Sequence, residues 1–69
     1  MTQKELLYIE DAIGHEENII SILESTIENL EDQNLVTFLK KEIKVHENLR
    51  TKLTEKLEGL ANVWSNTNG

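Results

Sequence analysis

The most constraining feature of the sequence is a pair of apolar stripes at helical spacing, separated by one short polar segment. The segment Glu31-Asp32-Gln33-Asn34 divides the chain into two nearly equal halves. In the first half, apolar residues recur in alternating steps of three and four, which places them on one side of an α-helix. The second half repeats the pattern with a mean step near the ~3.6 residues of a straight helix. The sequence therefore predicts two helices joined by a turn.

Each stripe is interrupted once, by a titratable residue. The first stripe consists of Leu6, Ile9, Ile13, Glu16, Ile20, Leu23, Ile27 and Leu30. The second consists of Leu35, Leu39, Ile43, His46, Leu49, Leu53, Leu57, Leu60 and Trp64. We expect a hairpin over residues 1–65, with helices at about 3–30 and 35–64, a turn at about 31–34 and a disordered tail at 66–69.

Local signals define the helix starts. Thr2-Gln3-Lys4-Glu5 has the pattern of a capping box, in which the Thr hydroxyl and the Glu carboxylate each satisfy a free amide. Asp32 or Asn34 is expected to cap the second helix. Trp64 is expected to close the open end of the hairpin against the region of Leu6 or Tyr8.

The chain is too short to bury a large core by itself. It has 69 residues and no cysteine, so disulfides cannot support it and oligomerisation is the expected support. The apolar arc of each helix is also wider than a two-helix seam requires. We therefore predict an all-α fold, an antiparallel two-helix hairpin that dimerises into a four-helix bundle. The expected dimer or bundle core contains Ile9, Ile13, Ile20, Leu23, Ile27, Leu39, Ile43, Leu49, Leu53 and Leu57.

Charge restricts the class of partner. The net charge is −6, divided into −8 over residues 1–33 and +2 over residues 34–69. Nucleic acid and anionic lipid surfaces both require basic protein surface, so neither is an expected partner. No apolar run approaches the ~20 residues of a membrane span. The opposite charges of the two halves favour antiparallel packing within the hairpin.

The polar interruptions are the candidate functional residues. Folding the chain about a turn near Gln33 would bring Glu16, Glu42, His46 and Arg50 into one polar layer at mid-hairpin. The first interpretation is a satisfied polar layer that fixes register and subunit number. A second is a metal site formed by Glu16, His46 and Glu42 that would hold Fe or Zn, and a third is a pH-sensitive contact at His46. Ile43 stands where a di-iron bundle would have the Glu of Glu-x-x-His. No catalytic constellation stands out, so we expect no enzyme and no cofactor.

The chain also resembles a known family. The segment Glu5-Leu6-Leu7-Tyr8-Ile9-Glu10-Asp11-Ala12-Ile13-Gly14-His15-Glu16 is similar to the first helix of coat F-type spore coat proteins. The Asp32 turn and the segment from Phe38-Leu39-Lys40-Lys41 to His46 extend the likeness over nearly the whole chain. The resemblance implies half of a ferritin-like bundle, completed by a dimer, in the bacterial cytoplasm or the spore coat. It also implies that Glu16 and His46 correspond to metal-ligating positions of ferritin-like relatives.

Three hypotheses follow from the sequence. The first is a non-enzymatic structural or interaction protein, a homodimeric bundle that associates with other coat or helical proteins. The second is a ferritin-like half-bundle that binds metal through Glu16 and His46. The third is an adaptor whose wide apolar face receives a helix from another protein.

Overall fold

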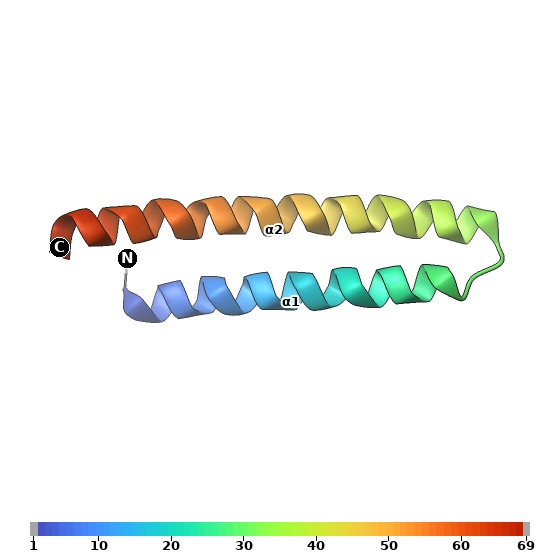
Figure 1. The fold of residues 1–69 in the computed structure, drawn as a ribbon, viewed down its shortest axis with the longest axis horizontal. Coiled ribbons are helices and arrows are strands. Elements are labelled where there is room, and N and C mark those ends of the chain that lie inside the picture. The colour runs from blue at the N-terminus through green and yellow to red at the C-terminus, as the bar shows by residue number, and fades with distance from the viewer. Residues whose placement is uncertain (1, 69) are drawn as a thin grey trace.

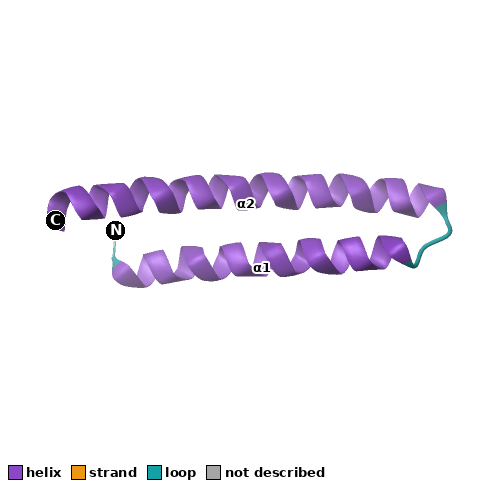
Figure 2. Cartoon of the chain, in the orientation of Figure 1, coloured by secondary structure: helices purple, strands orange, loops and turns teal. Residues whose placement is uncertain are grey.

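Two antiparallel helices form the molecule. The computed structural model describes the backbone of residues 2–68 and the side chains of residues 2–63. Helix α1 spans Gln3–Glu28 and helix α2 spans Gln33–Asn68, and both lie along one axis of a rod that measures 53 × 15 × 13 Å (Figure 1). Within the described chain, only its N-terminal end and the connection between the helices are drawn as loop in Figure 2. The predicted all-α hairpin is therefore confirmed.

The N-terminus of α1 is fixed by the capping box that the sequence predicts. Thr2 Oγ1 accepts a hydrogen bond from the Glu5 amide at 3.1 Å, and Glu5 Oε1 accepts one from the Thr2 amide at 3.0 Å. The Glu5 carboxylate accepts hydrogen bonds from the Thr2 backbone N–H, which has the larger effect, and from the Thr2 hydroxyl. Both bonds hold the pKa of the Glu5 carboxyl below its ordinary value. The negative charge of Glu5 is thus stabilised at the positive end of the helix dipole.

The turn lies two residues earlier than we predicted. Helix α1 ends at Glu28 instead of residue 30, and α2 begins at Gln33 instead of residue 35. Asp32 is the cap, because its carboxylate accepts from the amides of Asn34 at 2.8 Å and Leu35 at 3.2 Å. At the other side of the turn the Asn29 side chain donates to the carbonyl of Ser25 at 3.0 Å. Two Asx side chains therefore satisfy the free backbone groups between the helices.

Helix α2 is longer than we predicted. It continues through Asn68, where we expected it to end at Trp64 and a disordered tail to follow over 66–69. The predicted tail at 66–69 is polar, but it contains no proline. Adding a residue to an existing helix requires fixing the backbone dihedral angles of only that residue, so the helix continues. Gly69 and the predicted contact of Trp64 lie outside the described backbone and side chains. Figure 1 shows that α2 extends past the start of α1.

The seam between the helices differs from the predicted stripe at two positions of α2. Val36 is buried at 8% exposure, whereas Leu35 is 49% exposed and lies outside the seam. Arg50 is half-buried in the seam, whereas Leu49, which belongs to the predicted stripe, is 42% exposed in the single hairpin. With these two changes the inward residues of α2 alternate in steps of three and four, as those of α1 do. The predicted stripe followed apolar character and so passed over Arg50, although the regular spacing required it.

The hairpin has a thin core. Among the residues whose side chains are described, only Ile20 and Val36 are buried, at 5% and 8% exposure. The other seam residues, including Ile13, Leu23, Ile43 and Leu53, are half-buried. Two helices in contact along one line leave most of their circumference open to solvent, so the hairpin by itself covers little apolar surface.

Candidate functional site

Among the residues whose side chains are described, the seam contains one polar contact between the two helices, formed by Glu16 and His46. The Nδ1 atom of His46 lies 2.5 Å from Oε2 of Glu16, and it donates to that carboxylate as Nδ1–H. The side chain of Glu16 is 12% exposed and that of His46 is 25% exposed. The contact joins the middle of α1 to α2 across 30 residues of sequence. Each of these two polar side chains thereby has a hydrogen-bond partner within the seam.

The pairing register differs from the one we predicted. Folding about Gln33 placed Glu16 level with Leu49 and about one turn from His46. In the structure the connecting residues are 29–32, and this earlier turn moves α2 by about one helical turn along α1. Glu16 is therefore directly level with His46.

Glu42 and Arg50 are half-buried on either side of His46, but they do not join the pair. Among residues 2–63 the structure has ion pairs at Glu16–His46 and Asp11–His15, and neither Glu42 nor Arg50 takes part in one. Within the described residues no group of three or more His, Cys, Asp or Glu side chains is placed to hold a metal ion. The structure thus brings together two of the three predicted metal ligands, Glu16 and His46, and leaves Glu42 apart.

Surface depressions lie elsewhere. One is lined by Ser21, Ile22, Ser25, Thr26 and Asn29, and another by Lys52, Glu55 and Lys56. Neither depression includes Glu16 or His46. The pair lies in the seam with side-chain exposures of 12% for Glu16 and 25% for His46, a setting suited to holding two helices in register.

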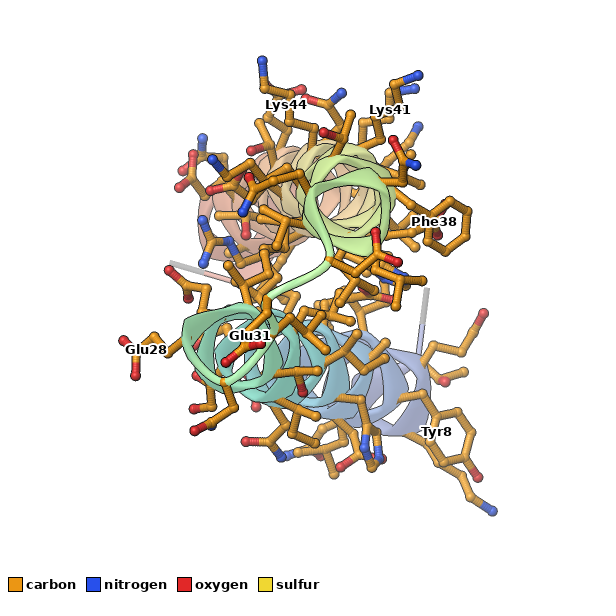
Figure 3. The ribbon with its side chains drawn as sticks, turned by 90° about the vertical axis from the view of Figure 1, so that its right-hand side faces the viewer. Tyr8, Glu28, Glu31, Phe38, Lys41 and Lys44 are labelled. Atoms are coloured by element: carbon orange, nitrogen blue, oxygen red, sulfur yellow. The ribbon has the colours of Figure 1, made fainter. Side chains whose placement is uncertain are left out.

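The second feature is an exposed apolar surface on one side of the hairpin. In Figure 3, which looks along the hairpin, Tyr8 of α1 and Phe38 of α2 project to the same side, and Glu28 projects to the other. Ile22 follows Tyr8 by four turns and Val45 follows Phe38 by two, so each shares that side. Neighbouring positions of α2 complete the surface. We call it the apolar face, and it consists of Tyr8, Ile22, Leu35, Phe38, Val45, Leu49 and Val63, all large and exposed.

The opposite side of the hairpin is charged. It carries acidic residues that follow each other at seven-residue spacing, namely Glu10, Glu17 and Glu24 of α1 and Glu31 of the connection between the helices. Leu7 is the one large exposed apolar side chain among residues 2–63 that does not belong to the apolar face. The hairpin therefore has one apolar side and one polar side, in addition to the seam between its helices.

Helix α1 has two further features on its surface, an ion pair that the sequence analysis missed and an open position at Gly14. His15 Nε2 pairs with Asp11 Oδ2 at 3.3 Å, and both side chains are well exposed. Their spacing of four residues is the signal that could have identified this contact. At Gly14 the exposed surface of α1 is open, because a Cβ atom there would meet nothing within 4 Å.

No protein-family model, curated protein or solved structure matches this chain. The resemblance to coat F-type proteins and the localisation that it implies therefore stay predictions. Within the described part of the chain no helix is long and apolar enough to cross a membrane.

Proposed function

We propose that the protein is a structural or interaction protein that self-associates through its apolar face into a homodimeric four-helix bundle. The observation that carries the proposal is the collection of seven large exposed apolar side chains on one side of the hairpin. Large apolar side chains gathered on one exposed side mark an interaction site in soluble proteins. The thin core supports the same conclusion, because a hairpin of this size gains stability chiefly by adding a second layer.

A second copy is favoured as the occupant of the apolar face. The face contains side chains of both helices and extends over most of the rod, so two such faces match each other in length and width. Packing two hairpins face to face produces the arrangement of four amphipathic helices that commonly encloses a bundle core. The polar side with Glu10, Glu17 and Glu24 remains in solvent.

The Glu16–His46 pair has a structural role in this proposal. It lies in the seam of each hairpin, and its polar atoms are satisfied within one chain. The pair fixes how the two helices align, which in turn fixes the positions of side chains on the apolar face. Formation of the bundle therefore depends on the alignment of the two helices within each hairpin.

The test compares two substitutions at equally exposed apolar positions. Val45 on the apolar face and Leu7 on the other side are each 57% exposed. Sedimentation equilibrium at micromolar concentration should give a dimer for the parent chain and for Leu7→Glu, and a monomer for Val45→Glu. A monomeric parent chain, or equal effects of the two substitutions, would overturn the proposal. A parent chain that copurifies in stoichiometric complex with a different helical protein would identify the adaptor alternative.

A further inference from the structure

On α2 the apolar face carries three charged residues, whose positions along the helix are not symmetric. Acidic Glu42 lies on the half nearer the turn, and Lys52 and Lys56 lie on the half nearer the C-terminus. All three share the two helical strips that form the face on α2. The first strip is Leu35, Glu42, Leu49, Lys56 and Val63, and the second is Phe38, Val45, Lys52 and Gly59.

The first strip is complementary to a second copy of itself that runs in the opposite direction. Glu42 and Lys56 each lie seven residues from Leu49, and Leu35 and Val63 each lie fourteen residues from it. If a second α2 lies antiparallel with its Leu49 opposite Leu49, then Glu42 of each copy is level with Lys56 of the other. Leu35 is then level with Val63, and the whole strip is matched apolar to apolar and acid to base.

The second strip fits the same alignment at Phe38, whereas Val45 becomes level with Lys52 of the other copy to within one residue. Phe38 of one copy becomes level with Gly59 of the other, to within one residue. Phe38 is 57% exposed, and the space where a Cβ atom of Gly59 would lie is open. A large ring therefore meets the position on the facing helix that has the most room, as close packing of two helices requires.

We infer that the two copies pack with their turns at opposite ends, α2 against α2, about a two-fold axis at Leu49. This inference rests on the proposed function and specifies how the second copy is placed. The competing face-to-face arrangement has both turns at one end and sets α2 against α1 of the second copy. There Glu42 is level with the segment around Ile19 and Ile22, because Glu16 and His46 are level in each hairpin. The carboxylate then faces apolar side chains without a cation, which is unfavourable.

The position of the turn in each copy distinguishes the two arrangements. The chain contains no cysteine, so Glu31→Cys introduces a single site for a nitroxide label at the turn, away from the apolar face. Pulsed electron spin resonance should give a distance of about 50 Å between the labels if the turns lie at opposite ends. Turns at one end would give roughly 20 Å, set by the width of two helix layers.

A charge exchange provides the second measurement. Glu42→Lys should weaken dimerisation roughly tenfold, since it replaces two attractive contacts with two repulsive ones. Adding Lys56→Glu to that variant should restore the parent dissociation constant. A label distance near 20 Å in a dimer, or no recovery in the exchanged variant, would overturn the antiparallel placement while leaving dimerisation intact. A monomeric labelled chain without dipolar coupling would instead overturn the proposed function itself.

Discussion

The contact between Glu16 and His46 should show strong energetic coupling, which a double-mutant cycle can measure. The four proteins are the parent chain, Glu16→Leu, His46→Leu and the double variant. In His46→Leu the Glu16 carboxylate, 12% exposed, loses its partner and has little access to water, so the cost should be about 1–3 kcal/mol. The double variant removes both polar groups and continues the apolar seam, so it should be at least as stable as the parent. The expected coupling energy is about 2 kcal/mol.

The assay is urea denaturation followed by far-UV circular dichroism, at two protein concentrations so that association is separated from folding. The matched control is the Asp11–His15 pair, which has the same chemistry but side chains that are 76% and 70% exposed. The double-mutant cycle of this control pair, with Asp11→Ala and His15→Ala, should give a coupling energy of no more than about 0.5 kcal/mol. If the Glu16 and His46 effects add within about 0.5 kcal/mol, the two side chains do not act as a pair and the register argument fails.

Three further predictions concern the helices. Asp32→Ala should lower the free energy of unfolding by about 1 kcal/mol through loss of the α2 cap, and Asp32→Asn should recover most of it; equal losses in urea melts would contradict the capping role. Because the pKa of Glu5 is lower in the folded chain, its contribution is present above the ordinary carboxyl pKa and is lost as pH falls through the lowered value. Glu5→Gln should therefore lower the melting temperature at about pH 7 and have a smaller effect at about pH 3; a pH-independent difference would count against this. Gly14→Ala should stabilise the hairpin by about 0.5–1 kcal/mol, because the helical position has open space for a methyl group, and any loss of stability would indicate an unseen contact there.

Much of the fold could be predicted from local patterns. The capping box at Thr2 and the alternating spacing of α1 depend only on neighbouring residues, and both occur as expected. The turn was placed two residues late because Glu31 and Asn34 are as polar as the true connecting residues. Polarity does not locate a turn, whereas the bonds from the amides of Asn34 and Leu35 to Asp32 do.

The predicted site was correct in its two central residues and wrong in its register. Glu16 and His46 stand out because each interrupts an apolar stripe, and the structure joins them. Their direct contact could not be derived, since an error of two residues in the turn displaces the facing helix by about a full turn. The one-sided arrangement of Phe38 and Tyr8 also required the structure, because it depends on how two helices are rotated relative to each other.

The location of the pair shows what it contributes to the fold. A hairpin with two regular apolar stripes has competing alignments, displaced by seven residues, in which the seam spacing is preserved. In those alignments Glu16 would face Leu39 or Leu53, and His46 would face Ile9 or Leu23. Each displaced alignment therefore separates Glu16 from His46 and places both opposite apolar side chains, at about 1–3 kcal/mol for each group that is left without a partner. Only the observed alignment pairs Glu16 with His46. The pair therefore discriminates between registers, even if a hairpin with apolar residues at both positions would be more stable than the parent chain. The apolar face depends on that choice, because a displacement of seven residues along the seam would separate the side chains of α1 from those of α2 that complete the surface.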